Sequence, residues 1–258
     1  TYAAPAHRSR VTQLSSELRR AGAESGRQFG HPRQTKRLTM QNPYDQIAEQ
    51  WHANSRGQAY VERVLSYVDK ILEGLPPGAK VLDMGCGTGR PIAVYIARRG
   101  YRVVCVDQSK EMLRIAKREV PEAEFIHGDM VEIRLTDKFA AAVAWDSVFH
   151  VERRQHSAVF RKLANSLEVG ARLLLSIGGS DAGETVDSGV EGFTSEMFGY
   201  TFFYSGYAQH VARRLLETEG FEIELCEVDD PSSRGHLAVI ARKATQAAAD
   251  KAGETCAS

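Results

Sequence analysis

The sequence has few cysteines, and they follow no recognisable pattern. Four occur among 258 residues (Cys86, Cys105, Cys226 and Cys256), and none forms a C-x-x-C pair. A zinc-ribbon or thioredoxin-like motif needs such a pair, so neither class of site is indicated. Cys86 and Cys105 lie among apolar residues and glycines, and we expect them to be buried, reduced thiols.

Long apolar runs and an excess of charge are also missing. No apolar run approaches the roughly 20 residues that cross a bilayer, so we expect no membrane contact and a cytoplasmic protein. Lys and Arg together number 33, as do Asp and Glu. Domains that track a phosphate backbone usually carry excess positive charge, so the balance argues mildly against a nucleic-acid substrate. The eight histidines show no H-x-x-x-H spacing, and no metal site is predicted.

Large apolar residues are scarce at both ends of the chain. Residues 1–39 carry eight basic and two acidic residues, and such a segment cannot bury enough surface to offset its ordering entropy. We expect a disordered basic extension or an artefact there, with a transit peptide as the alternative. Residues 244–258 are rich in alanine and are expected to form a disordered tail. The folded domain is therefore expected over residues 40–243.

Within that domain, short apolar runs alternate with segments of helical periodicity. Strands are expected over 79–83, 101–107, 123–127, 139–146, 171–177, 221–229 and 237–242, and helices over 44–51, 60–71, 92–99, 110–120, 151–167 and 206–219. The alternation is typical of an α/β fold with a parallel sheet covered on both faces. The last two strands predict an antiparallel end to that sheet. Residues 179–205, rich in Gly, Ser, Asp and aromatic residues, interrupt this alternation of strands and helices.

One strand runs directly into a glycine-rich turn and then a helix, with the sequence V-L-D-M-G-C-G-T-G at residues 81–89. Gly85, Gly87 and Gly89 let the backbone approach a ligand closely, and the helix N-terminus offers free N–H groups. Ligands of open α/β sheets lie outside the carboxyl ends of the strands. A dinucleotide fingerprint would need glycine at position 90, where Arg90 stands, and the G-K-[ST] of a Walker A loop is absent.

Three acids follow the first three expected strands. Asp83, just before the turn, favours a cationic ligand group over a pyrophosphate. Asp107 lies 18 residues beyond Gly89, where an acid accepts hydrogen bonds from two ribose hydroxyls. Asp129 and Met130 suit an adenine site, because the carboxylate accepts from the exocyclic amine while the thioether packs the ring. Asp107 as a plain surface acid and Asp129 as a helix cap are the alternatives.

Four motifs together resemble the class I S-adenosylmethionine-dependent methyltransferases, and look closest to small bacterial members that modify metabolites. They are D-x-G-C-G-T-G at 83–89, V-D-x-S-x-x-M-L at 106–113, G-D-M at 128–130 and W-D-S at 145–147. The resemblance covers residues 43–243. It implies a Rossmann-like, seven-stranded and mostly parallel sheet of order 3-2-1-4-5-7-6 with the seventh strand antiparallel. It also implies S-adenosylmethionine as cofactor, whose ammonium and sulfonium groups agree with the acid at position 83.

The resemblance further implies which side chains surround the cofactor. By this resemblance Asp83, Gly85, Gly87 and Gly89 line the methionine moiety, and Asp107 is the ribose-binding acid. Gln108 and Met112 pack near the adenine, which Asp129 and Met130 read. Trp145 and Asp146 face the sulfonium, and Tyr44 is the N-terminal residue that covers the cofactor. Two alternatives stay open, because Met112 is equally a core residue and Trp145 a buried sheet residue.

Methyl transfer is an in-line displacement that depends mainly on proximity and the exclusion of water, so no catalytic residue need be visible in the sequence. His150, four residues beyond Asp146, is the candidate general base. Its alternative is a loop histidine that packs on Trp145 or caps the next helix, and His236 is taken as structural. Aromatic residues of the segment 179–207 are candidates to enclose the acceptor, or else to form a local core or a dimer interface: Phe198, Tyr200, Phe203 and Tyr204.

The predicted function is methyl transfer to a small-molecule acceptor by a monomer or homodimer. An exocyclic-amine nucleic-acid methyltransferase would show N/D-P-P-Y/F where residues 146–149 read D-S-V-F. Arg90 argues against a nicotinamide-dependent reductase. A protein methyltransferase and a non-catalytic cofactor-binding scaffold or sensor remain open.

Overall fold

The computed structural model describes residues 42–54, 57–178, 192–230 and 236–245. The expectations for residues 1–39, and for the tail beyond residue 245, lie outside the described residues. The elements, in chain order, are α1 (Pro43–Ala53), α2 (Gln58–Leu72), β1 (Lys80–Met84), α3 (Ile92–Arg98), β2 (Arg102–Asp107), α4 (Lys110–Glu119), β3 (Glu124–His127), β4 (Phe139–Ala144), η1 (Val148–His150), α5 (Arg153–Ser166), β5 (Leu167–Gly178), β6 (Phe193–Met197), β7 (Tyr200–Tyr204), α6 (Gln209–Thr218), β8 (Phe221–Asp230) and β9 (His236–Lys243).

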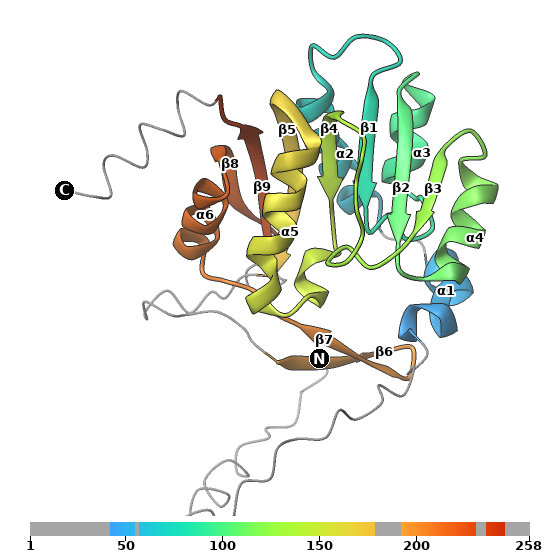
Figure 1. The fold of residues 1–258 in the computed structure, drawn as a ribbon. Helices are drawn as coiled ribbons and strands as arrows, with labels where there is room; N and C mark the ends of the chain where they lie inside the picture. Colours follow the sequence, from blue (N-terminus) through green and yellow to red (C-terminus); the bar gives the residue numbers. More distant parts are fainter. Residues whose placement is uncertain (1–41, 55–56, 179–191, 231–235, 246–258) are drawn as a thin grey trace, which may run out of the picture. The chain divides into compact units, whose positions relative to one another are not determined.

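Seven of the nine strands in the described residues form one sheet of order β3-β2-β1-β4-β5-β9-β8 (Figure 1). The pairs among β1 to β5 are parallel, whereas β9 is antiparallel to both β5 and β8. Parallel neighbours need a long crossover, and the short connection between β8 and β9 permits only an antiparallel pair. The predicted sheet, with its order and its antiparallel seventh strand, is confirmed.

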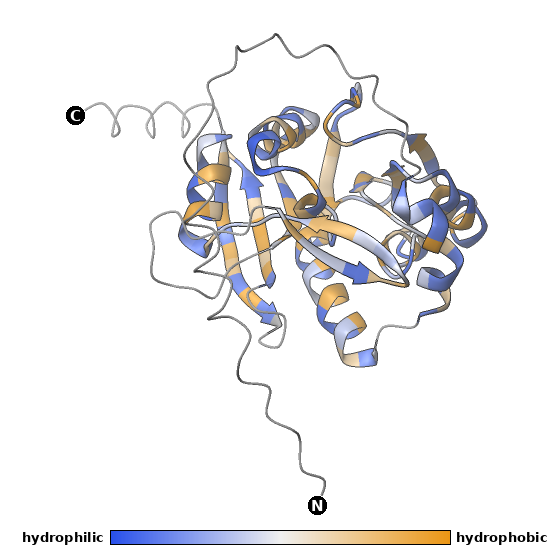
Figure 2. Ribbon diagram, turned by 90° about the horizontal axis from the view of Figure 1, so that it is seen from below, coloured by the Kyte–Doolittle hydropathy of each residue, from blue (hydrophilic) through white to orange (hydrophobic). Residues whose placement is uncertain are grey.

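Helices cover both faces of the sheet. Figure 1 shows α5 and α6 in front of it and α2 and α3 behind it. The front cluster joins apolar residues of α5, such as Phe160 and Leu163, to Leu82 and Met84 of β1, and the rear cluster joins α2 and α3 to the opposite face of the same strands. The central strand β4 is buried along its whole length. Hydropathy follows this layering, since apolar residues mark the strands and polar residues much of the helix surface (Figure 2).

A separate two-stranded sheet, β6–β7, lies beneath the carboxyl ends of the parallel strands, beside α1 (Figure 1). The residue pattern of this segment predicted no strand. Met197 pairs with Tyr200, and the two residues between them have positive φ angles of 52° at Phe198 and 80° at Gly199. This is the two-residue type I′ geometry, whose usual signal is Asn-Gly or Asp-Gly. The aromatic residue at the first turn position hides that signal.

Helix α1 belongs to a third apolar cluster, apart from the two sheet faces. Its buried members are Ile47, Ala48, Met112, Ile115 and Phe202, which come from α1, α4 and β7. The cluster ties the N-terminal helix and the β6–β7 hairpin to the first helix after β2. None of the described helices combines the length and apolarity that crossing a bilayer requires.

Candidate cofactor and acceptor site

The glycine turn after β1 has the backbone geometry that requires glycine. Gly85, Gly87 and Gly89 all have positive φ angles, of 81°, 54° and 81°. The N–H group of Gly85 donates to the Val106 carbonyl at 2.7 Å, which draws the turn against β2. A Cβ atom on Gly85 would lie 2.3 Å from the Cβ of Ser147. Position 85 therefore excludes a side chain both by conformation and by space.

Asp107, at the end of β2, is locked to this turn. Its Oδ2 accepts from the Gly87 N–H at 2.9 Å, and its Oδ1 accepts from the Ser109 N–H at 2.8 Å. Burial raises the pKa of Asp107, while the two backbone donors act to lower it. The Ser109 hydroxyl in turn donates to Asp45 at 2.6 Å and accepts from the Met112 N–H at 3.1 Å. Asp107, the predicted ribose-binding residue, thus links the glycine turn to the start of α4, and Ser109 extends this hydrogen-bonded network to α1.

Asp83 lies directly beneath the turn and is only 2% exposed. It stands in register with Cys105 of β2 on one side and Val143 of β4 on the other. Burial, followed by the charge of Asp107, raises the pKa of Asp83 to about 7. Near neutral pH this carboxyl group is poised between its neutral and charged forms, and a cationic ligand group nearby favours the charged one.

The residues expected at the adenine are divided between surface and core. Gln108 is exposed, whereas Met112 is 1% exposed and belongs to the third apolar cluster, which agrees with the core alternative for it. Asp129 begins a turn in which its Oδ1 accepts from the Val131 N–H at 2.7 Å. No helix begins here, so Asp129 is not a helix cap: one oxygen accepts within a turn, and Oδ2 makes no hydrogen bond with the described part of the chain. Met130 packs at the edge of the front cluster.

At the end of β4, the structure uses Trp145 and Asp146 in a hydrogen-bonded network. Trp145 is 5% exposed, and its Nε1 donates to the Tyr60 hydroxyl at 2.9 Å. That hydroxyl donates to Asp146 Oδ2 at 2.6 Å, and the Asp146 N–H donates to Ser176 Oγ at 2.7 Å. Asp146 has a positive φ of 49°, so the strand ends two residues before it rather than at it. Its carboxylate is thus engaged with protein donors.

His236, treated in the sequence as a structural residue, completes this network. Its Nε2 lies 2.9 Å from Asp146 Oδ1, and its Nδ1 pairs with Asp229, which Arg63 also approaches at 3.4 Å. Burial acts to lower the pKa of His236, but hydrogen bonds and charge from the two aspartates outweigh it and raise the pKa to about 9. An imidazolium therefore bridges two carboxylates. Sequence reasoning missed this contact because the partners are up to 90 residues apart and β9 inserts between β5 and β8.

His150 contacts Tyr44, the predicted cover residue. The Tyr44 hydroxyl lies 2.7 Å from His150 Nε2, and His150 Nδ1 lies 2.8 Å from the Phe203 carbonyl oxygen. A carbonyl only accepts, so the proton is on Nδ1 and Nε2 accepts from the tyrosine hydroxyl. Burial lowers the pKa of His150. The imidazole is therefore neutral near pH 7, with its lone pair directed at Tyr44.

The four aromatic residues proposed for the acceptor occupy two places. Phe198 and Tyr200 are at the hairpin turn and are each 40% exposed. Phe203 supplies its carbonyl to His150, and the ring centroid of Tyr204 lies 4.8 Å from that of His150. Phe149, which the sequence did not single out, stacks on Tyr204 at 5.7 Å. The structure thus brings the Tyr204 ring and the Phe203 backbone carbonyl to the candidate base, whereas Phe198 and Tyr200 lie at the hairpin turn.

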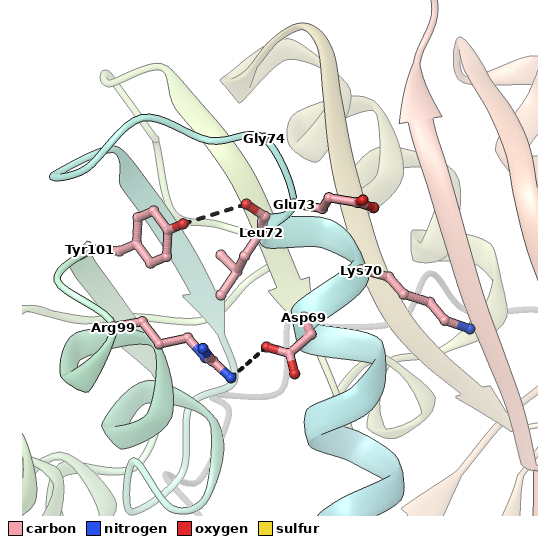
Figure 3. Close-up of a pocket in the computed structure, with 7 residues that line it drawn as sticks. All are labelled: Asp69, Lys70, Leu72, Glu73, Gly74, Arg99 and Tyr101. Carbon is pink, nitrogen blue, oxygen red and sulfur yellow. Dashed lines mark hydrogen bonds and ion pairs between the residues drawn. The ribbon is translucent and has the colours of Figure 1, made fainter.

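A surface pocket of about 450 Å³ lies elsewhere, at the C-terminal end of α2. Figure 3 shows Arg99 paired with Asp69, and the Tyr101 hydroxyl directed to the Leu72 carbonyl. Tyr101 directly precedes β2, so this pocket is at the amino edge of the sheet, opposite the glycine turn. None of the predicted site residues lines it. In the part of the chain that the structure describes, no group of three or more His, Cys, Asp or Glu could hold a metal ion.

Comparisons with known proteins agree with this geometry. A family model described as "Methyltransferase domain" matches residues 81–170. A dTDP-3-amino-3,4,6-trideoxy-alpha-D-glucopyranose N,N-dimethyltransferase from Streptomyces venezuelae is 29% identical over 45% of this chain and 49% of its own. A ubiquinone biosynthesis O-methyltransferase from Xanthomonas axonopodis is 34% identical over 43% of this chain and 47% of its own. The chain thus spans about half the length of these relatives.

Solved structures share the fold. A S-adenosylmethionine-dependent methyltransferase from Methanosarcina mazei has a TM-score of 0.58 at 23% identity and covers 69% of this chain and 98% of its own. A 1,6-didemethyltoxoflavin-N1-methyltransferase from Burkholderia thailandensis, solved with bound 1,6-didemethyltoxoflavin and S-adenosylhomocysteine, has a TM-score of 0.59 at 20% identity over 79% and 88% of the two chains. Residues 81–170 of this chain thus match a methyltransferase domain, and its described part shares the fold of these solved methyltransferase structures.

Proposed function

We propose that the chain transfers the methyl group of S-adenosylmethionine to a small-molecule acceptor by in-line displacement. The observation that carries the proposal is the Asp107 carboxylate closed onto the Gly87 and Ser109 N–H groups at the carboxyl edge of the sheet. This arrangement holds the glycine turn in a ligand-ready form and leaves acceptor lone pairs on the carboxylate for ribose hydroxyls. Asp83 then faces the cationic methionine end, and Asp129 the adenine.

The Tyr44–His150 pair supplies a route for a proton. The neutral imidazole accepts from the Tyr44 hydroxyl, so that oxygen in turn accepts a proton from a nucleophile beside it as its own proton passes to Nε2. Such a relay serves a hydroxyl, which loses its proton as the methyl group arrives, or an ammonium, which must lose a proton before its nitrogen has a lone pair to attack with. His150 is the proposed general base, acting through Tyr44, and the rest of catalysis is proximity.

A small organic acceptor is supported by the named activities of the relatives. One is an amino-sugar N,N-dimethyltransferase, another a ubiquinone biosynthesis O-methyltransferase, and a third methylates 1,6-didemethyltoxoflavin. In this chain, the Phe149 and Tyr204 rings stack beside His150, which suits a planar or apolar acceptor. Phe198, Tyr200 and Phe203 remain predicted contributors to that pocket.

Calorimetric titration with S-adenosylhomocysteine, with NADH as control, tests the cofactor. Saturable binding of the first ligand alone supports the proposal, and binding of neither ligand contradicts it. Transfer of a labelled methyl group from S-adenosylmethionine to pooled metabolites then separates an enzyme from a scaffold, since a scaffold binds the cofactor and transfers nothing. Pools of peptides test the protein-methyltransferase alternative in the same assay.

The raised pKa of Asp83 makes cofactor binding pH-dependent. Below about 7 the carboxyl group is protonated and neutral, and the protein must release that proton to bind the ligand's ammonium as a charge pair. We expect affinity for S-adenosylhomocysteine to rise by up to about 10-fold from pH 6 to pH 8 as the charged fraction increases. Calorimetry in two buffers of different ionisation enthalpy measures the released proton. Asp83→Asn should bind more weakly with no such slope, and an Asp83→Asn profile that keeps the slope would contradict the assignment.

A further inference from the structure

Lys162, on α5, is a half-buried lysine that the proposed reaction does not use. Its Nζ donates to the Met130 carbonyl at 2.7 Å and to the Val131 carbonyl at 2.7 Å. Both acceptors belong to the turn that follows β3. A single side chain thus ties the helix on the front face of the sheet to two consecutive peptide groups of that turn.

The turn is the one that Asp129 begins. The Asp129 carbonyl accepts from the N–H groups of Glu132 and Ile133 at 3.0 and 2.8 Å. Its side-chain Oδ1 accepts from the Val131 N–H at 2.7 Å. Each peptide group that Lys162 holds is therefore part of the frame that fixes the direction of the Asp129 carboxylate.

The position of Lys162 removes part of the hydration of its ammonium group. Burial lowers the pKa of Lys162, against the charges of Asp129 and Glu132, which act to raise it. These two acids are the charged groups of the turn that face the ammonium. A lysine needed only to cover apolar surface keeps its head group in water. Here the head group is drawn inward to two carbonyl oxygens, whose hydrogen bonds offset the loss of hydration.

We propose that Lys162 is a positioning residue for adenine recognition: by holding the Met130 and Val131 carbonyl groups, it fixes the turn that presents Asp129 to the 6-amino group of the cofactor. The proposal rests on the proposed function, because Asp129 reads adenine only if the site takes an adenosyl cofactor. Lys162 itself does not touch the ligand.

Base discrimination tests this role without an acceptor. S-inosylhomocysteine carries a carbonyl where S-adenosylhomocysteine carries the 6-amino group, and an N–H group where adenine has the acceptor N1, so the ratio of their dissociation constants reports how this edge of the base is read. Calorimetry should show a wild-type preference for the adenosyl ligand of about 10-fold or more. Lys162→Met should lower that ratio about 5-fold, with little change in affinity for the inosyl ligand. Lys162→Arg, which keeps the donors, should retain most of the preference.

Two further variants make the result specific. Lys138 also donates to a carbonyl of α5, that of Asn165, but it does not touch the Asp129 turn, and Lys138→Met should leave the ratio unchanged. Asp129→Asn should itself abolish the preference, and adding Lys162→Met to it should change the ratio no further. If the Lys162→Met variant does not fold, Lys162→Gln replaces it in this test, because the glutamine side chain is too short to bridge both carbonyl groups.

The outcomes are distinct. A Lys162→Met variant that keeps the wild-type ratio, or that weakens both ligands equally, overturns the positioning role while the proposed function stands. Equal wild-type binding of the two ligands also overturns it, because adenine is then not read at the 6-amino group. A wild-type protein that binds neither ligand refutes the proposed function itself.

Discussion

Replacing Asp107 by alanine is expected to weaken S-adenosylhomocysteine binding by at least about 10-fold, the largest effect of any single cofactor-site substitution. The carboxylate makes two kinds of contact. It would accept from two ribose hydroxyls, and hydrogen bonds to a charged group contribute about 1.5–3 kcal/mol each. It also holds the Gly87 and Ser109 N–H groups, so its loss leaves two backbone donors without their partner and loosens the turn that receives the methionine end.

Calorimetry measures this loss, and Asp69→Ala is the matched control. Asp69 lines the pocket at the amino edge of the sheet, and its removal should leave the affinity within about 2-fold of wild type. Asp107→Asn should fall between the two, because the amide keeps one acceptor oxygen and loses the charge. An Asp107→Ala dissociation constant equal to that of the wild type would contradict the assignment of Asp107 as the ribose-binding residue.

Replacing Gly85 by alanine is expected to produce the largest loss of stability. The left-handed backbone, with φ of 81°, costs an alanine about 1–2 kcal/mol. The new Cβ would meet the Ser147 Cβ at 2.3 Å, and overpacking of this kind costs about 1–3 kcal/mol. Together these lower the melting temperature by roughly 4–20 °C in a domain of this size. Differential scanning calorimetry, with and without S-adenosylhomocysteine, measures the shift.

Gly74→Ala separates the two causes. Gly74 has nearly the same φ of 80°, but no atom lies within 4 Å of its potential Cβ. It should therefore show only the conformational part of the loss. The double variant Gly85→Ala/Ser147→Gly removes the colliding atom and should recover part of the stability. If Gly85→Ala proved no less stable than Gly74→Ala, the close approach of the two loops would not hold in solution.

The parts of the site that the sequence predicted are those encoded by contiguous residues. The end of a strand, with Asp83, and the glycine turn lie within the nine residues 81–89, a helix begins at Ile92, and each step has a local cause. Asp107 follows because neighbouring parallel strands end at the same edge of the sheet. The sheet order itself came with the family resemblance, and the short β8–β9 connection explains its antiparallel end.

The parts that sequence reasoning missed depend on contacts between distant segments. Nothing near His236 in the sequence indicates that Asp146, 90 residues away, will pair with it, because that contact exists only once β9 has inserted beside β5. Lys162 reads as an ordinary polar position of an amphipathic helix. The hairpin turn carries Phe198 where Asn or Gly is usual, so its positive φ could not be anticipated from residue type.

The third apolar cluster has a consequence for turnover. Its buried residues, in α1, α4 and β7, belong to neither of the clusters that hold the sheet together. Opening α1 and the hairpin exposes the side chains of this cluster and breaks the Tyr44–His150 and Asp45–Ser109 hydrogen bonds, while the two clusters on the sheet stay intact. Such a motion costs a fraction of the global unfolding free energy. Under the proposed function, this small cluster would control the step that admits a fresh cofactor and releases the spent one, and slow product release is the expected limit on the catalytic rate.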